Sequence, residues 1–166
     1  MQLPEVEELL RELAQQIRPH LTPDTVLVGI HTGGVWVAEN LREQLGVKTP
    51  LGALDISFYR DDFSRIGLHP EVKPSRIPFE VEGRHIILVD DVLKTGRSIR
   101  AAMNDLFDFG RPASILLAVL VDRGGRELPI AARFVGVHLD LEDNQDIRLN
   151  RAESGQLSLS LDDAKG

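Results

Sequence analysis

Apolar residues recur at helical spacing in the N-terminal segment of the chain. They are Val6, Leu9, Leu10, Leu13 and Ile17. This spacing places them on one face of a helix, so the pattern predicts an amphipathic helix over residues 4–18. Pro19 follows directly and is expected to end that helix.

The chain then alternates between short apolar runs and amphipathic segments. Strands are predicted at residues 26–30, 51–59, 85–89, 115–121 and 134–137, and helices at residues 35–45 and 98–109. Such a succession is typical of a parallel sheet with helices on both faces. The apolar runs are nearly continuous, as expected for strands that are buried on both sides. We therefore predict a single α/β domain over residues 1–166.

Two segments do not follow this alternation. Residues 60–80 carry charged residues and prolines without clear periodicity, which indicates a functional loop, a lid or a β-arm. Residues 155–161 read GQLSLSL and alternate between apolar and polar positions, so they are a candidate edge strand.

Composition narrows the class of protein only moderately. The chain has no cysteine, which excludes disulfides, thiolate metal sites and a cysteine nucleophile. The acidic N-terminal segment does not have the pattern of a signal peptide, and no apolar run approaches the roughly 20 residues of a membrane span. We therefore expect a cytoplasmic protein with no membrane partner. The net charge of −7 argues against non-specific binding of nucleic acid.

Residues 86–98 hold the most informative pattern. A strand of four apolar residues leads into Asp90 and Asp91, and a small-residue turn, Thr95 to Ser98, comes just before a helix. Free N–H groups at the start of a helix bind anions, so this turn suits a phosphate. Carboxylates accept hydrogen bonds from sugar hydroxyls and can assist Mg²⁺. Together these features fit a ribose 5-phosphate.

Two kinds of alternative to this interpretation exist: these residues could have a purely structural role, or they could be part of another nucleotide-binding motif. Asp90 and Asp91 could be ordinary polar residues at a strand end, and Ser98 a helix N-cap. The Walker pattern GxxxxGK[ST] and the dinucleotide pattern GxGxxG are both absent from the sequence. In open α/β sheets, ligands bind beyond the carboxyl ends of the strands. Three polar loops are expected there, at residues 31–34, 90–98 and 122–126.

Residues 87–98, ILVDDVLKTGRS, resemble the motif with which type I phosphoribosyltransferases bind 5-phosphoribosyl 1-pyrophosphate (PRPP). Three further segments are similar to the pyrimidine operon regulators of that family, which also have uracil phosphoribosyltransferase activity. These segments are VGIHTGG, LDISFYRDD and GRPASILLAVLVDRGGRELPI. The resemblance runs without interruption over about residues 26–137 and so points to the subfamily as well as to the fold.

The resemblance implies a type I phosphoribosyltransferase fold, with a mainly parallel sheet flanked by helices. A flexible loop is expected at about residues 60–80 and a small hood at about residues 122–150. The implied enzyme is a glycosyltransferase that converts uracil and PRPP into UMP and pyrophosphate, with Mg²⁺ bound together with PRPP. A role in regulating pyrimidine biosynthesis genes is also implied. The alternative is an attenuator that senses UMP or PRPP, binds RNA and has weak catalysis.

The resemblance also implies roles for individual residues. PRPP or UMP would be bound by Thr32, Gly33, Gly34, Asp90, Asp91, Val92, Leu93, Lys94, Thr95, Gly96, Arg97 and Ser98. The residues expected at the reacting centre are Asp90, Asp91 and Arg60. Backbone groups near Val121 and Asp122 would bind uracil, and Arg126 and Arg133 belong to a face that contacts RNA in the attenuators. No metal site made of protein side chains alone is expected.

This chain departs from the family pattern at three positions. Gly33 stands where the regulators have arginine in the pyrophosphate loop, Gly125 where they tend to have histidine, and Ala131 where they tend to have a basic residue. The last two changes remove contacts useful for RNA, so RNA is a weaker expectation than the small molecules. A phosphoribosyltransferase for a purine base or orotate is a further alternative. Trp36 is expected to be a packing residue and not a platform on which a base stacks. The protein is expected to be a homodimer or homotetramer.

Overall fold

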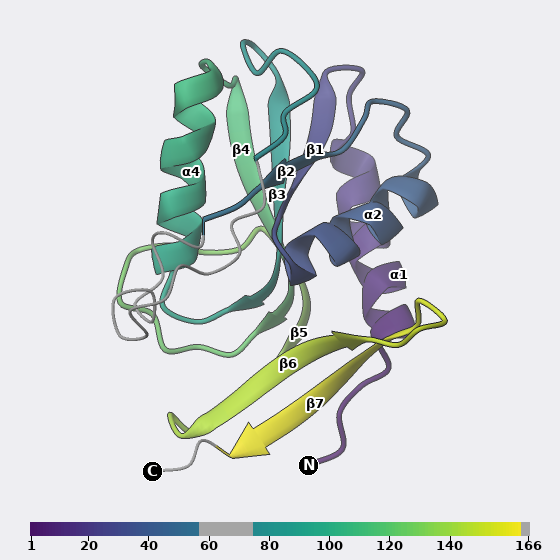
Figure 1. Ribbon diagram of the computed structural model, residues 1–166, viewed down its shortest axis with the longest axis vertical. Coiled ribbons are helices and arrows are strands. Elements are labelled where there is room, and N and C mark those ends of the chain that lie inside the picture. The colour runs from purple at the N-terminus through teal and green to yellow at the C-terminus, as the bar shows by residue number, and fades with distance from the viewer. Residues whose placement is uncertain (57–74, 164–166) are drawn as a thin grey trace.

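A computed structural model describes residues 1–56 and 75–163 of the chain (Figure 1). Its helices are α1 (Val6–Ile17), the short 3-10 helix η1 (Arg18–His20), α2 (Gly33–Leu45) and α4 (Arg97–Phe109). Its strands are β1 (Thr25–Ile30), β2 (Gly52–Leu54), β3 (His85–Leu93), β4 (Ser114–Asp122), β5 (Phe134–His138), β6 (Gln145–Arg151) and β7 (Leu157–Asp163). None of the helices described is long and apolar enough to cross a membrane.

Five strands form the central sheet in the order β2-β1-β3-β4-β5, and every neighbouring pair is parallel. All six residues of β1 are buried, as are Ile86 to Asp90 of β3. A strand that is covered on both faces needs apolar side chains in both directions, which explains the continuous apolar runs in the sequence. The predicted α/β fold with a parallel sheet is therefore confirmed.

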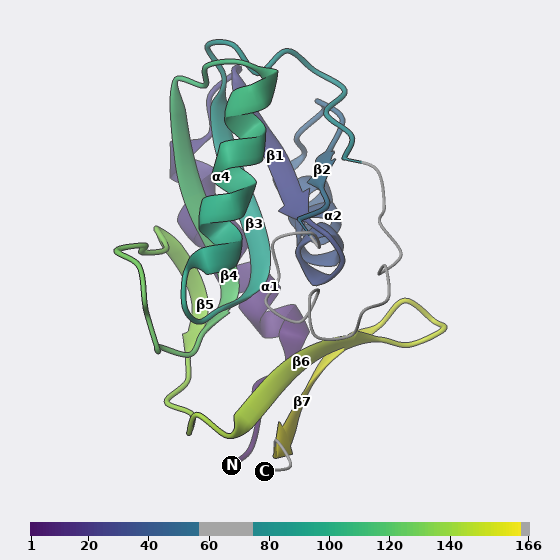
Figure 2. The same ribbon diagram turned by 60° about the vertical axis from the view of Figure 1, so that its left-hand side comes forward.

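Helices cover both faces of this sheet (Figures 1 and 2). On one face, Leu27 of β1 and Ile87 of β3 belong to the same buried cluster as the apolar residues of α1 and α2. On the other face, Val26 and Val28 of β1 share a cluster with Ile99 and the other buried residues of α4. Side chains alternate between the two faces of a strand, so each strand contributes to both cores.

The ends of the helices follow from local chemistry. Glu7 and Glu8 lie in the first turn of α1, where negative charge is favourable, and Pro19 comes directly after its last turn. Gly46 closes α2 in the left-handed conformation, with φ of 68°. The predicted helix over residues 4–18 is therefore confirmed.

Strands β6 and β7 form a separate antiparallel hairpin beside α1, close to both ends of the chain (Figure 1). The candidate edge strand at residues 155–161 is confirmed as β7, whereas its partner β6 was not predicted. Ile147 and Leu149 of β6 are buried and extend the core around α1 and α2. The hood expected at about residues 122–150 overlaps only the first strand of this hairpin, and its boundaries remain a prediction.

Two predicted boundaries near the carboxyl ends of the strands are wrong. Strand β3 continues to Leu93, because its ladder with β4 extends through the Leu93–Asp122 pair. Asp90 and Asp91 therefore lie within the strand, not after it. Helix α2 begins at Gly33 and not at residue 35. The Trp36 N–H donates to the carbonyl of Thr32, so both glycines are part of the first helical turn.

Of the predicted strand at residues 51–59, the structure describes residues 51–56, and β2 covers Gly52–Leu54 of them; residues 57–59 lie outside the described residues. Most of the predicted flexible loop at residues 60–80, with Arg60, lies outside the described residues. In its described part, Arg76 pairs with Ala53 through two backbone hydrogen bonds of 2.8 and 2.7 Å. This antiparallel bridge ties the end of the loop to the edge of the sheet.

Candidate active site

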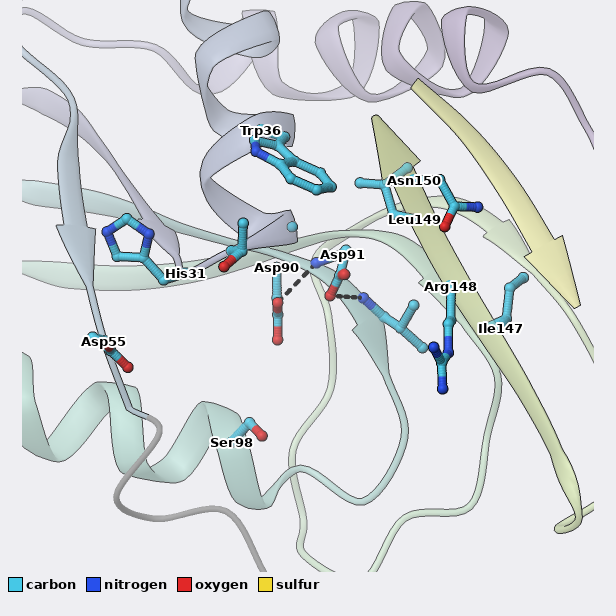
Figure 3. A pocket seen from close by; sticks show the side chains of 13 residues that line it. His31, Trp36, Asp55, Asp90, Asp91, Ser98, Ile147, Arg148, Leu149 and Asn150 are labelled. Carbon is cyan, nitrogen blue, oxygen red and sulfur yellow. Dashed lines mark hydrogen bonds between the residues drawn. The ribbon is translucent and has the colours of Figure 1, made fainter. Parts of the chain in front are cut away.

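A cleft of about 630 Å³ opens at the carboxyl ends of β1 and β3. Strands β1 and β3 are neighbours in the sheet, but the helices that follow them, α2 and α4, pack on opposite faces. In open α/β sheets, ligands bind at such a switch point. The cleft is lined by His31, Thr32, Gly33, Trp36, Asp55, Asp90, Asp91, Val92, Ser98, Ile147, Arg148, Leu149 and Asn150 (Figure 3). One wall comes from the sheet and α2, and the other from β6.

Backbone hydrogen bonds orient both carboxylates of β3. Oδ1 of Asp90 accepts a hydrogen bond of 2.9 Å from the Asp91 N–H, and Oδ1 of Asp91 accepts one of 2.8 Å from the Val92 N–H. Asp90 is buried, with 7% of its surface exposed, and Asp91 is half-buried. Two fixed carboxylates therefore line the cleft next to each other, as the sequence predicted.

These carboxylates also fit a magnesium ion that arrives with a substrate. Mg²⁺ is usually held by one or two carboxylates together with phosphate oxygens of the substrate and water. Among the described residues, no group of three or more histidine, aspartate or glutamate side chains is arranged to hold a metal. Asp90 and Asp91 would thus supply part of the coordination, and a bound diphosphate the rest.

Glycines let the start of α2 lie directly against β3. A Cβ on Gly34 would come within 2.5 Å of the Val89 carbonyl oxygen, and a Cβ on Gly33 within 2.7 Å of Cγ of Asp91. The peptide bond between His31 and Thr32 is cis. Thr32 and Gly33 of the predicted loop thus line the same cleft as the two carboxylates, whereas Gly34 packs against the backbone of β3.

The predicted phosphate turn precedes α4. Gly96 is the N-cap of this helix and has φ of 93°, a conformation that glycine adopts readily. Oγ1 of Thr95 accepts a hydrogen bond of 3.1 Å from the Arg97 N–H. A second hollow of about 90 Å³ is lined by Asp90, Val92, Leu93, Lys94, Thr95, Gly96, Ser98 and Ile99. Because Gly96 is the N-cap, the alternative that gave this role to Ser98 is wrong.

Asp122 lies at the end of β4 and forms an ion pair with Arg126. Arg126 Nη2 donates to Asp122 Oδ2 at 2.6 Å, and the Gly124 N–H donates to Oδ1 at 3.0 Å. Burial would raise the pKa of Asp122, but these hydrogen bonds and the nearby positive charge outweigh it, so the pKa is lowered. The backbone carbonyl of Asp122 accepts from the Leu139 N–H at 2.9 Å.

The predicted uracil residues and RNA residues do not line the main cleft, although Val121 is the ladder partner of Val92, which does. Val121 is buried in the sheet, and Asp122 lines a separate hollow with His138 and Asp140. Arg126 also donates to the carbonyls of Ile130 and Lys94, at 2.7 and 3.0 Å. All three nitrogens of its guanidinium thus have acceptors within the chain, whereas Arg133 is exposed.

Sequence reasoning missed several residues of the cleft, namely Trp36, Asp55 and the β6 residues Ile147 to Asn150. Trp36 was expected to be a packing residue; it does pack against the core around α1 and α2, but it also lines the cleft, and the guanidinium carbon of Arg151 lies 4.7 Å from its ring centroid. Its position in the first turns of α2, three residues after Gly33, is a signal that could have placed it here. The β6 residues had no comparable signal, because their strand was not predicted.

Comparison with known proteins agrees with this geometry. Residues 1–148 match the model of the phosphoribosyl transferase domain family. The structure is similar to a hypoxanthine-guanine phosphoribosyltransferase from Bacillus anthracis, with a TM-score of 0.67, 20% identity and 84% of each chain covered. It is also similar to a purine phosphoribosyltransferase from Pyrococcus horikoshii, with a TM-score of 0.62, 24% identity and 81% of each chain covered. The fold and the cleft thus define a phosphoribosyltransferase.

Curated relatives narrow this class. A protein of Nitrosococcus oceani named Bifunctional protein PyrR is 54% identical over 93% of this chain and 90% of its own length. A protein of Pseudomonas syringae pv. tomato, also named Bifunctional protein PyrR, is 52% identical over 98% of this chain and 97% of its own length. The chain therefore belongs to the PyrR family of phosphoribosyltransferases. This result confirms the resemblance seen in residues 26–137.

Proposed function

We propose that the protein transfers the ribose 5-phosphate group of PRPP to uracil and releases pyrophosphate. The observation that carries this proposal is that Asp90 and Asp91 line one cleft with Thr32 and Gly33, and that Asp90 also lines the adjoining hollow formed by the turn before α4. Two anion-binding turns flank two hydrogen-bond acceptors, which matches a sugar with a phosphate at one end and a diphosphate at the other.

The arrangement suggests how the reaction proceeds. The N–H groups around Gly96 hold the 5-phosphate, and Asp90 and Asp91 accept hydrogen bonds from the ribose hydroxyls. The bond between the anomeric carbon and pyrophosphate breaks, a bond to a ring nitrogen of uracil forms, and the proton of that nitrogen passes to the departing pyrophosphate or to water. Positive charge develops on the sugar in between, and the two carboxylates stabilise it. Mg²⁺ bound with PRPP would neutralise the departing pyrophosphate.

For other residues, we propose the roles that the resemblance to the family implies. Arg60, in the loop outside the described residues, is proposed to act near the pyrophosphate when that loop closes. Backbone groups near Val121 and Asp122 are proposed to bind uracil. A homodimer or homotetramer and a cytoplasmic location likewise stay predictions.

Formation of UMP from uracil and PRPP with Mg²⁺ tests the proposal directly. We expect turnover by the unmodified protein and a loss of about 100-fold or more in Asp91→Asn, because the variant loses the charge that stabilises the sugar. The side-chain oxygen of asparagine can still accept from the Val92 N–H, so the fold should be kept. Asp108→Asn on the exposed surface of α4 is the matched control. Equal turnover in Asp91→Asn and Asp108→Asn would refute the role of Asp91.

The choice of base is tested in the same assay. Hypoxanthine, guanine and orotate are offered in competition with uracil at equal concentration. The solved structures named above act on purines by their titles, but identities of 20% and 24% show the fold alone. Preferential consumption of a purine would replace uracil in the proposal and leave the phosphoribosyl transfer intact.

Regulation through RNA is a second candidate function. The relatives are named bifunctional, which favours an activity besides catalysis. Titration with the leader RNA of a pyrimidine operon, with and without UMP, tests it. Tight binding that depends on UMP would establish this function, and its absence would leave the protein as an enzyme. Arg133 is the residue to vary here, since the guanidinium of Arg126 is engaged within the chain.

A further inference from the structure

The cleft is rich in negative charge for a site that binds a phosphorylated sugar. The carboxylates of Asp55, Asp90 and Asp91 all line it. Of the described residues along its walls, Arg148 is the one lysine or arginine (Figure 3). A diphosphate carries several negative charges and is bound best by charge-assisted hydrogen bonds, which arginine supplies in pairs.

The start of α2 contributes no lysine or arginine side chain to the cleft. Gly33 offers backbone groups, and the side chain of Asp91 occupies the space into which a side chain on Gly33 would have to grow. A cation that serves a diphosphate beside Gly33 must therefore come from another element. Strand β6 forms the opposite wall and carries Arg148.

The backbone of β6 is held in place on both sides of Arg148. Ile147 and Leu149 are buried, with 7% and 8% of their surfaces exposed. The guanidinium of Arg123, whose side chain is 4% exposed, donates to the carbonyls of Gln145 and Glu142 at 2.6 and 2.9 Å. The backbone on which Arg148 sits is thus fixed by the core and by a buried hydrogen-bonded arginine.

The side chain of Arg148, in contrast, is bound only weakly. Its Nε lies 3.3 Å from Oδ2 of Asp162 on β7, and the two side chains are 67% and 53% exposed. Exposed ion pairs of this kind contribute little to stability, because water and salt screen them. The guanidinium can therefore leave Asp162 for a more highly charged partner in the cleft.

We propose that Arg148 binds the diphosphate of PRPP and supplies the positive charge that Gly33 does not. This assignment rests on the proposed function, since it presupposes PRPP as the substrate. The 5-phosphate has its own hollow before α4, so Arg148 acts on the opposite end of the substrate. Arg148 would then be a substrate-binding residue contributed by the hairpin and not by the parallel sheet.

The test compares Arg148→Gln, Arg148→Lys and Asp162→Asn. Arg148→Gln and Asp162→Asn both remove the same ion pair, so any effect on folding is shared, whereas only Arg148→Gln removes the guanidinium. Calorimetric titrations with Mg²⁺ would use three probes, namely PRPP, inorganic pyrophosphate and ribose 5-phosphate. The KM values for PRPP and for uracil would be measured in parallel.

We expect Arg148→Gln to weaken binding of PRPP and of pyrophosphate by about tenfold or more. Arg148→Lys should recover part of this affinity, and Asp162→Asn should bind at least as tightly as the unmodified protein. Ribose 5-phosphate affinity and the KM for uracil should stay unchanged. Unaltered pyrophosphate affinity in Arg148→Gln, or an equal loss in Asp162→Asn, would overturn the assignment. These titrations measure binding and do not need turnover. The role of Arg148 can therefore be tested even if the protein binds PRPP but does not transfer its sugar to uracil.

Discussion

The backbone of Gly33 lies against the side chain of Asp91, so that a Cβ on Gly33 would come within 2.7 Å of Cγ of Asp91. The start of α2 and the end of β3 thus meet at the centre of the cleft. Gly33 and Gly34 differ in what they touch: a Cβ on Gly34 would meet the backbone carbonyl of Val89 at 2.5 Å. A side chain can move aside, whereas a carbonyl in a central strand cannot do so without distorting the sheet.

Substitution of the two glycines should therefore separate activity from stability. Gly33→Ala is expected to displace the Asp91 carboxylate and to lower UMP formation at least tenfold, with little change in the free energy of unfolding. Gly34→Ala is expected to destabilise the fold by about 1–3 kcal/mol, as overpacking in a core does. Turnover assays and urea denaturation of both variants check this. A Gly33→Ala variant with full activity would show that Asp91 is not needed in its observed position.

Gly96→Ala should impair both folding and phosphate binding. Its φ of 93° strains any side chain, and a Cβ would lie 2.9 Å from Cγ1 of Ile130. Gly83→Ala is the control for backbone strain alone, because Gly83 has φ of 75° and nothing within 4 Å of a Cβ. Strain of this kind costs about 1–3 kcal/mol. We expect both variants to lose stability in urea denaturation, but only Gly96→Ala to lose affinity for ribose 5-phosphate. Equal ribose 5-phosphate affinity in the two variants would contradict the placement of the phosphate.

Trp36 should report on the occupancy of the cleft. It is the one tryptophan of the chain, its ring lines the cleft and Arg151 lies over it. Binding of PRPP or UMP is expected to change the intensity or wavelength of its emission, because the surroundings of the ring change. The signal should vanish in Trp36→Phe and persist in Arg151→Gln with an altered baseline. Emission that stays constant while calorimetry detects binding would place the ligand elsewhere.

Arg126 should matter for stability and Arg133 should not. Loss of the three hydrogen bonds to Asp122, Ile130 and Lys94 in Arg126→Met is expected to cost about 1–3 kcal/mol, since polar groups lose their partners. Arg133→Met changes an exposed side chain and is expected to cost less than about 0.5 kcal/mol. Thermal and urea unfolding measure the difference. Equal stability of the two variants would mean that the Arg126 contacts contribute nothing.

The lowered pKa of Asp122 makes stability depend on pH in acid. A carboxyl whose pKa is lower in the folded protein than in the unfolded chain stabilises the fold above the unfolded pKa, which is about 3.8 for Asp122. That stabilisation is lost as the pH falls through the lower, folded pKa. The free energy of unfolding should therefore differ more between the unmodified protein and Asp122→Asn at pH 6 than at a pH below about 4, with the variant the less stable of the two. Urea unfolding at both pH values checks this, and a pH-independent difference would contradict it.

The strands of the parallel sheet, the helices α1, α2 and α4 and part of the cleft could be predicted from local sequence. Asp90 and Asp91 were expected close to the turn at Gly96, and the structure brings them together because a strand, a turn and a helix start follow one another in the chain. Arg148 could not be placed in this way, and Trp36 could be placed only from the start of α2. Their positions depend on where α2 starts and on the pairing of β6 with β7, and β6 alternates polar residues with two buried ones, which gives a weak local signal.

One wall of the cleft is formed by residues that follow the entire parallel sheet in the chain. A chain that stopped at His138 would already contain all five strands of the parallel sheet and both segments proposed to bind anions. It would have only one wall of the cleft, because the other wall is residues 147–150. During synthesis on the ribosome, the strands of the parallel sheet are therefore complete before the second wall of the cleft is. A shortened product would keep the turns proposed to bind phosphate but would lack Arg148 and the buried residues Ile147 and Leu149.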